Sequence, residues 1–179
     1  MNKQKIAKGI EQILEGIGED PNRPGLRETP RRVAEMYFDL LSGTENEPVV
    51  HSGFMEDVSD KEIIIIKNID FFSFCEHHFL PFFGKVNIGY LPARNRVAGF
   101  SNFVDIVDTY SKRLQIQERL TNQIANAIMK SLKPKGVFVL IEATQLCVSM
   151  RKTHTPATKT VTRVVRGELS ADQISRVFF

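Results

Sequence analysis

The sequence has little of what marks membrane, secreted or nucleic-acid-binding proteins. Its 179 residues include only two cysteines and no tryptophan. No apolar run approaches the roughly 18 residues that a membrane helix needs, and the first residues lack the apolar core of a signal peptide. The 24 Lys and Arg residues against 21 Asp and Glu residues give a net charge of +3, which is too small to indicate nucleic-acid binding. We therefore expect a cytoplasmic protein with no membrane and no nucleic-acid partner.

The first part of the chain is expected to form a helical arm. Its apolar residues recur at helical spacing. Thr29 and Pro30 then predict the N-cap and first turn of a second helix. The polar, turn-rich segment that follows is typical of a linker. We place the arm and linker in residues 1–57 and the main domain in residues 58–179.

The main domain changes to a pattern of strand pairs and helices. Two strands are followed by two helices, then by a second pair of strands and a short helix capped by Ser170. These elements are EIIIIKN and residues 85–91, helices over about 102–113 and 115–132, and the strands GVFVLIEA and TKTVTRVV. The run EIIIIKN is typical of a buried strand. Strands in sequential pairs favour antiparallel hairpins, so the predicted fold class is α+β.

Cys75-Glu76-His77-His78 is the densest cluster of chemically active residues. A cysteine three residues before a histidine allows both side chains to reach one ion from a single loop. Cys147 is the only other thiol, and distant cysteines in a cytoplasmic protein are more often free or metal-bound than paired. Two thiolates and one imidazole suit Zn²⁺ and leave its fourth position open for water, as in catalytic zinc sites. The alternative is that both thiols are small buried side chains and the histidines form a polar turn.

A second candidate site lies at the start of the long predicted helix, in the run Gln115-Ile116-Gln117-Glu118-Arg119. A fixed carboxylate such as that of Glu118 can accept two hydrogen bonds from the N–H and NH₂ edge of a guanine ring. The alternative is that Glu118 only compensates the positive end of the helix dipole, which is common.

Four segments together resemble the GTP cyclohydrolase I family. They occur in the family's order and with family-like spacing across residues 28–167. They are ETPRRVAEMY, FFSFCEHHFLPFFGKVNIGYLP, RLQIQERLTNQIANAI and EATQLCVSMRK followed by KTVT. The resemblance implies the T-fold, an antiparallel sheet backed by two helices. It also implies a toroidal homo-oligomer, a decamer in the family, with its sites between subunits.

The resemblance assigns roles to residues of both candidate sites. The implied zinc ligands are Cys75, His78 and Cys147. The zinc activates water to attack C8 of the purine, and His77 matches the family histidine that acts as acid and base near N7. Glu118 matches the carboxylate that binds the guanine edge, with Gln117 beside it. The implied reaction converts GTP and water to formate and 7,8-dihydroneopterin triphosphate.

The sequence departs from the family at several functional positions. Gln145 replaces a histidine two residues before the second zinc cysteine, and we assign it to the catalytic centre although an amide cannot carry a proton near neutral pH. In the family's GLSKxxR segment, Ser101 is kept as a substrate-binding residue. Asn102 and Asp105 replace the lysine and arginine of that segment, which bind the triphosphate. Glu35 likewise replaces a family lysine.

Three basic residues are left to bind phosphate. Arg32 and Arg151 match phosphate-binding arginines of the family, and Lys152 replaces the glycine that usually follows. The loss of two charge-assisted hydrogen bonds costs about 3–6 kcal/mol, or roughly 10²–10⁴ in affinity. We therefore expect a zinc hydrolase of the family type and keep two alternatives open. One is a paralog that acts on a guanine- or pterin-like ring without the triphosphate, and the other is a non-catalytic ligand-binding subunit.

Overall fold

The chain divides into two compact units, Met1–Ser42 and Gly43–Phe179. The computed structural model describes residues 1–48, 54–56, 61–94, 96–151 and 158–175. The domain boundary expected at residue 57 remains a prediction, because residues 57–60 lie outside this part. No helix within the described residues is long and apolar enough to cross a membrane.

The first unit is a pair of helices, α1 (Lys3–Gly16) and α2 (Thr29–Leu40), which pack against each other. The Asn2 side chain caps α1 by accepting a hydrogen bond from a first-turn amide at 2.9 Å. Each helix has an apolar stripe on one face, because its apolar residues recur every three or four positions. Leu14 and Ala34 are the buried residues of the two helices.

The start of α2 differs from the prediction, which placed the N-cap at Thr29. Thr29 is the first helical residue, and Glu28 holds the N-cap position with helical backbone angles and without a side-chain cap. The Glu28 carboxylate accepts a hydrogen bond from Arg31 at 2.9 Å, so it points along the helix rather than to the free amides. Pro30 follows in the first turn, where its missing N–H leaves no hydrogen bond unmade.

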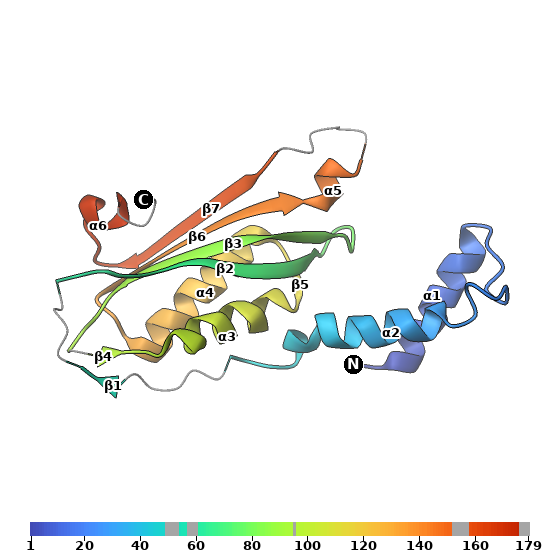
Figure 1. The fold of residues 1–179 in the computed structure, drawn as a ribbon, viewed down its shortest axis with the longest axis horizontal. Coiled ribbons are helices and arrows are strands. Elements are labelled where there is room, and N and C mark those ends of the chain that lie inside the picture. Colours follow the sequence, from blue (N-terminus) through green and yellow to red (C-terminus); the bar gives the residue numbers. More distant parts are fainter. Residues whose placement is uncertain (49–53, 57–60, 95, 152–157, 176–179) are drawn as a thin grey trace. The chain divides into compact units, whose positions relative to one another are not determined.

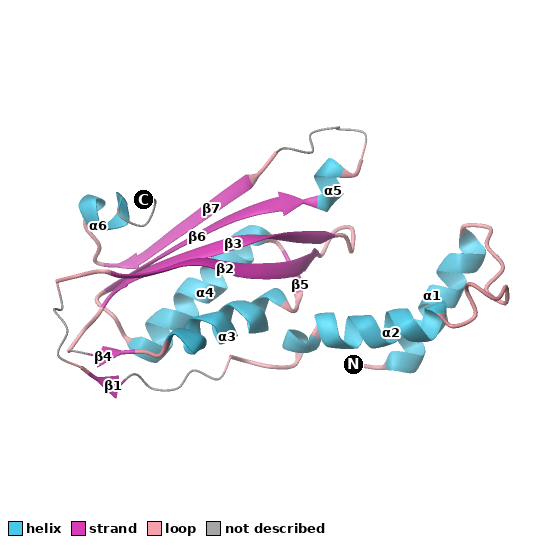
Figure 2. Ribbon diagram, viewed as in Figure 1, coloured by secondary structure: helices cyan, strands magenta, loops and turns pink. Residues whose placement is uncertain are grey.

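The second unit is built on a five-stranded sheet with the order β5-β2-β3-β6-β7 (Figures 1 and 2). The four long strands run antiparallel to one another, and the short β5 runs parallel to β2. The strands are β2 (Ile64–Cys75), β3 (Pro81–Leu91), β5 (Leu114–Gln115), β6 (Gly136–Gln145) and β7 (Thr160–Gly167). The predicted antiparallel sheet is confirmed, and β5 is an addition to it.

Two helices, α3 (Phe100–Ser111) and α4 (Gln117–Leu132), pack on one face of this sheet (Figure 1). The two helices lie between β3 and β6 in the sequence, although these strands are neighbours in the sheet. After β3 the chain therefore passes over one face of the sheet through both helices before β6 pairs with β3. Alternate strand residues and every third or fourth helix residue point into the shared interface. The core includes Val86, Ile88, Val139 and Ile141 of the sheet and Phe103, Ile106, Leu120, Ile124 and Ile128 of the helices.

Both helices begin two residues away from their predicted starts. The helix α3 begins at Phe100 rather than Asn102, with Gly99 in the N-cap position. The helix α4 begins at Gln117 rather than Gln115, because the two residues before Ile116 join the edge of the sheet as β5.

The first half of β2 is not the buried strand that the sequence predicts. The isoleucines at 63–66 are only partly buried, and alternate members pack on opposite faces of the sheet. Two of them join the main core, and two join a smaller cluster around Phe138 and Leu140. The helix α6 (Ala171–Ser175) adds to this smaller cluster. Its predicted cap is confirmed, since Ser170 Oγ accepts a hydrogen bond from a first-turn amide at 3.1 Å.

Several short elements complete the second unit. The strands β1 (Phe54–Met55) and β4 (Arg96–Val97) pair with each other. A 3-10 turn over Ser42–Thr44 begins at the last residue of the first unit. The one-turn helix α5 (Leu146–Ser149) follows β6 directly. None of these elements is long enough to leave a periodic pattern in the sequence.

Candidate metal centre and ring-binding site

Cys75, His78 and Cys147 come together at one end of the sheet. Their possible ligand atoms all lie within 4.8 Å of one another. Cys75 is the last residue of β2, and His78 lies in the turn that follows. Cys147 lies in α5, directly after β6. The structure therefore unites the three residues that the spacing singled out.

The strand pairing explains this meeting. The strand β3 lies between β2 and β6, and its residue Phe82 pairs with Ser73 on one side and with Gln145 on the other. The turn after β2 and the helix after β6 therefore leave the sheet at the same end (Figure 1). The Phe79 amide closes the turn by donating a hydrogen bond to the Cys75 carbonyl at 2.9 Å.

The donor set of this cluster fits a zinc ion. Cys75 is buried and Cys147 is partly buried. Burial and the neighbouring Cys75 thiol raise the pKa of the Cys147 thiol. A divalent cation held by both sulfurs would offset the cost of ionising them, because the thiolate is the form that binds metal. Two sulfurs and one imidazole are donors that zinc prefers over magnesium or calcium.

His77 lies beside the three possible ligands, with 64% of its side chain exposed. Its Nδ1 is 3.8 Å from Cys75 Sγ, and its ring stands nearly perpendicular to that of His78. A histidine placed in this way can exchange protons with water and still reach a molecule bound at the cluster. The acid–base role of His77 stays a prediction.

Glu118 lies exposed in the first turn of α4. Hydrogen bonds link that turn to residues 76–78 after β2, the candidate metal-binding turn. The Glu76 amide donates a hydrogen bond to the Gln115 carbonyl at 3.0 Å. Arg119 donates two hydrogen bonds to the Glu76 carboxylate, at 2.5 and 3.0 Å. The hydrogen bonds from Arg119 hold the pKa of the Glu76 carboxyl below its usual value. The two candidate sites of the sequence are therefore neighbours.

Gln117 is buried, with only 3% of its surface exposed. Its Nε2 donates to the carbonyl oxygens of Ile141 and Thr160 at 3.1 and 3.0 Å. Its Oε1 accepts a hydrogen bond from Gln145 Nε2 at 2.8 Å. Both ends of the Gln117 amide are thus bound by protein groups, and its role in substrate binding stays a prediction. Gln145 is the last residue of β6, two residues before Cys147, and its catalytic role stays a prediction.

The residues of the second unit that the sequence analysis connects with phosphate binding, or with its loss, lie in different surroundings. Arg151 is at the metal centre, with Nη1 3.1 Å from His78 Nε2. Ser101 is exposed in the first turn of α3. Asn102 beside it is buried, and its Nδ2 donates to the Gly99 carbonyl at 3.1 Å. Asp105 is exposed in the next turn.

The other residues expected near phosphate lie elsewhere in the chain. Arg32 and Glu35 are exposed on α2, in the first unit. Arg31 binds both carboxylate oxygens of Glu35, at 2.8 and 3.0 Å. Lys152 lies outside the described residues.

A model of the GTP cyclohydrolase I family matches residues 6–179. The chain belongs to the GTP cyclohydrolase I family. It is 48% identical over 172 residues to GTP cyclohydrolase 1 of Desulforamulus reducens, a match that covers 96% of this chain and 92% of that protein. It is 49% identical over 178 residues to GTP cyclohydrolase 1 of Caldanaerobacter subterraneus subsp. tengcongensis, covering 98% of this chain and 94% of that protein.

The crystal structure of the archaeosine synthase QueF-Like in the apo form shares the fold of this member of the GTP cyclohydrolase I family. The alignment has a TM-score of 0.50 at 17% identity and covers 61% of this chain and 97% of the other. At this identity the likeness shows the fold alone. The predicted T-fold and the predicted family are both confirmed.

Glu76 and Arg119 lie beside the candidate site of this family member, and the sequence analysis gave neither of them a role. Both stand inside the segments that carry the resemblance, next to residues with predicted roles. Their pairing leaves no local signal, because they are 43 positions apart and meet only through the folded sheet and helix.

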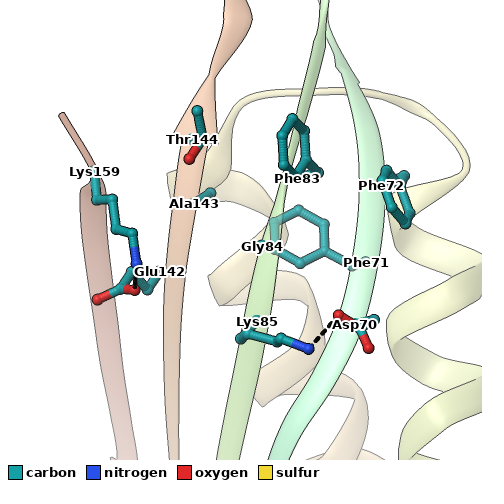
Figure 3. A pocket seen from close by; sticks show the side chains of 10 residues that line it. All are labelled: Asp70, Phe71, Phe72, Phe83, Gly84, Lys85, Glu142, Ala143, Thr144 and Lys159. Carbon is teal, nitrogen blue, oxygen red and sulfur yellow. Dashed lines mark hydrogen bonds and ion pairs between the residues drawn. The ribbon is translucent and has the colours of Figure 1, made fainter. Parts of the chain in front are cut away.

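A hollow of about 360 Å³ lies on the face of the sheet opposite α3 and α4 and includes none of the predicted site residues (Figure 3). The rings of Phe72 and Phe83, which help to line it, stack on each other with centroids 5.7 Å apart. Its charged residues form two ion pairs, Lys85 with Asp70 and Lys159 with Glu142. The charges that line this hollow are therefore already neutralised by one another.

Proposed function

We propose that this chain is a zinc-dependent hydrolase that opens the imidazole ring of a guanine-type purine at C8. The reaction is the conversion of GTP and water to formate and 7,8-dihydroneopterin triphosphate. The observation that carries the proposal is the meeting of Cys75, His78 and Cys147 within 4.8 Å, beside the first turn of α4, in a chain of this family. A site with three protein ligands leaves an open position for water.

Each residue of the site has a separate task in this proposal. Cys75, His78 and Cys147 would hold the zinc, which when bound supplies a Lewis acid that lowers the pKa of water toward about 7. His77 moves a proton to and from N7 of the ring. Glu118 holds the ring by accepting two hydrogen bonds from its N1–H and NH₂ groups. Gln145 does not move protons and orients groups in the catalytic centre by hydrogen bonding.

A second candidate is the same chemistry on a guanine- or pterin-like ring without the triphosphate. Two features favour it. Asn102 uses its side chain to bind the Gly99 carbonyl, and Asp105 places a negative charge on the exposed surface of α3. The residues that remain to bind a phosphate group are Arg151, Arg32 and Ser101. If the second candidate is right, guanosine binds within about tenfold of GTP.

We also propose that the active form is a homo-oligomer, with a decamer expected from the family. Two apolar residues support this: Ile13 of α1 and Ile17 directly after the helix are 58% and 70% exposed in the single chain. Apolar side chains in such positions are covered when subunits associate.

The metal assignment is tested by metal analysis of the purified protein. The unaltered chain is expected to hold about one zinc per chain, and Cys75→Ala, His78→Ala and Cys147→Ala are each expected to lose it, because two remaining ligands bind zinc weakly. The Cys147→Ala variant is the most informative of the three, because Cys147 lies in α5, far in sequence from the other two ligands. Full zinc content in Cys147→Ala would overturn the three-ligand assignment.

A further inference from the structure

Glu118 lies between two residues whose side chains form hydrogen bonds to the two chain segments that carry the candidate metal ligands. Gln117 precedes it and bonds to Gln145, two residues before Cys147. Arg119 follows it and bonds to Glu76, the residue after Cys75. Hydrogen bonds thus link the first turn of α4 to the end of β6, before Cys147, and to the turn after Cys75.

The hydrogen bonds of Gln117 hold the start of α4 in place relative to β6 and β7. The Gln117 amide is bound on both sides, to β6 and β7 through Nε2 and to Gln145 through Oε1. Thr121, one turn further, donates to the Gln117 carbonyl at 2.7 Å and lies 2.7 Å from Thr162 Oγ1. A fully bonded and buried polar network of this kind holds its members in one arrangement.

The paired hydrogen bonds between Arg119 and Glu76 fix both the distance between these two side chains and their relative orientation. Two nitrogens of Arg119 bind the two oxygens of Glu76, and such paired hydrogen bonds orient both groups. The Glu76 amide adds a third hydrogen bond to the Gln115 carbonyl. The side chains of Arg119 and Glu76 are 42% and 31% exposed, so the pair stays partly in water. An exposed ion pair contributes little to stability, which leaves positioning as its main effect.

We propose that Glu76 and Arg119 are a positioning pair that sets the distance between the metal-binding turn and Glu118. The inference rests on the proposed function, in which Glu118 holds the guanine edge of the ring. If Glu118 fixes one end of the ring and the metal centre acts at the other, C8 reaches the centre only when this distance is right. A displacement of about 1 Å can cost on the order of 10² in rate.

The test uses zinc-loaded full-length protein with Arg119→Met, Glu76→Gln and the double variant. Each single change is expected to lower kcat with GTP by about 10–100-fold, while KM and the affinity for guanosine change much less. Because both changes break one contact, the double variant should lose no more than the worse single one. Zinc content and Tm should stay close to those of the unaltered chain, and Arg119→Lys should recover only part of the loss.

Lys85→Met is the matched control, because it breaks another exposed ion pair on the opposite face of the sheet. It should leave kcat, KM and zinc content unchanged. Glu118→Gln separates the inference from the proposed function. If Glu118→Gln binds guanosine as well as the unaltered chain, the ring-binding role fails. If Glu118→Gln loses guanosine while the variants at Glu76 and Arg119 behave like Lys85→Met, the positioning role is overturned and the proposed function stands.

Discussion

At the residue scale, we predict that residue 105 of α3 affects how strongly the site binds phosphate. Asp105 is exposed, whereas the neighbouring Asn102 is buried and bound to the Gly99 carbonyl. An arginine at the exposed position 105 could bind a phosphate with two hydrogen bonds, whereas the carboxylate repels it. Asp105→Arg is therefore expected to raise the affinity for GTP by about tenfold or more, as measured by calorimetry, and to leave guanosine binding unchanged.

Asp172→Arg in α6 makes the same change of charge at another exposed position and controls for general attraction of anions. An equal gain for GTP in both variants would show that residue 105 does not face the phosphates. A gain for guanosine in Asp105→Arg would lead to the same conclusion, since guanosine carries no phosphate.

At the scale of elements, the close contact between β3 and β6 leaves no room for a side chain at one position. Gly84 of β3 pairs with Ala143 of β6, and a Cβ added at Gly84 would lie 1.9 Å from the Glu142 carbonyl oxygen. Gly84→Ala would force the strands apart, and overpacking of this kind costs about 1–3 kcal/mol. We expect Tm to fall by several degrees, as measured by calorimetric or optical melting.

Gly9→Ala is the natural comparison, because Gly9 lies within α1 and a Cβ there meets nothing within 4 Å. Alanine in a helix interior is favoured over glycine by roughly 0.5–1 kcal/mol. An unchanged or higher Tm for Gly9→Ala together with a lower Tm for Gly84→Ala is the expected pair of results. Equal effects of the two substitutions would contradict the close strand contact.

The longer elements could be predicted from the sequence because each has a periodic pattern over many residues. Helices α1 to α4 and the long strands leave such patterns, and the T-fold followed from the motifs. The two residues of β5 and the single turn of α5 leave none. Burial of the isoleucines at 63–66 was overestimated, because a run of apolar residues does not show which face of the strand meets a neighbour.

The candidate site was predictable where its residues are close in sequence. Cys75 and His78 share one turn, and the only other thiol belongs to Cys147, so the possible ligand set was small. The pairing of Arg119 with Glu76 and the bond from Gln145 to Gln117 depend on how strands and helix pack. No spacing rule connects residues that meet only through tertiary structure.

At the scale of the whole molecule, the family implies sites formed between subunits. An assembly of several chains would cover the exposed Ile13 and Ile17. It would also agree with the predicted role of Arg32, which lies on α2 of the first unit. We expect light scattering to give a mass that is a multiple of 20.3 kDa, with ten chains as the family value. Activity should be confined to the assembled fraction. A monomer with full activity would contradict an active site shared between subunits.

Formate release from the zinc-loaded assembly is the most direct test of the central claim, ring opening at C8. GTP and guanosine are compared in parallel, and pterin fluorescence is followed in the same samples. The account predicts formate from at least one of the two substrates, and none from the Cys147→Ala variant or from protein stripped of metal. An assembly that holds zinc and binds guanosine, yet releases no formate from either compound, would contradict it and would identify the chain as a non-catalytic binding subunit.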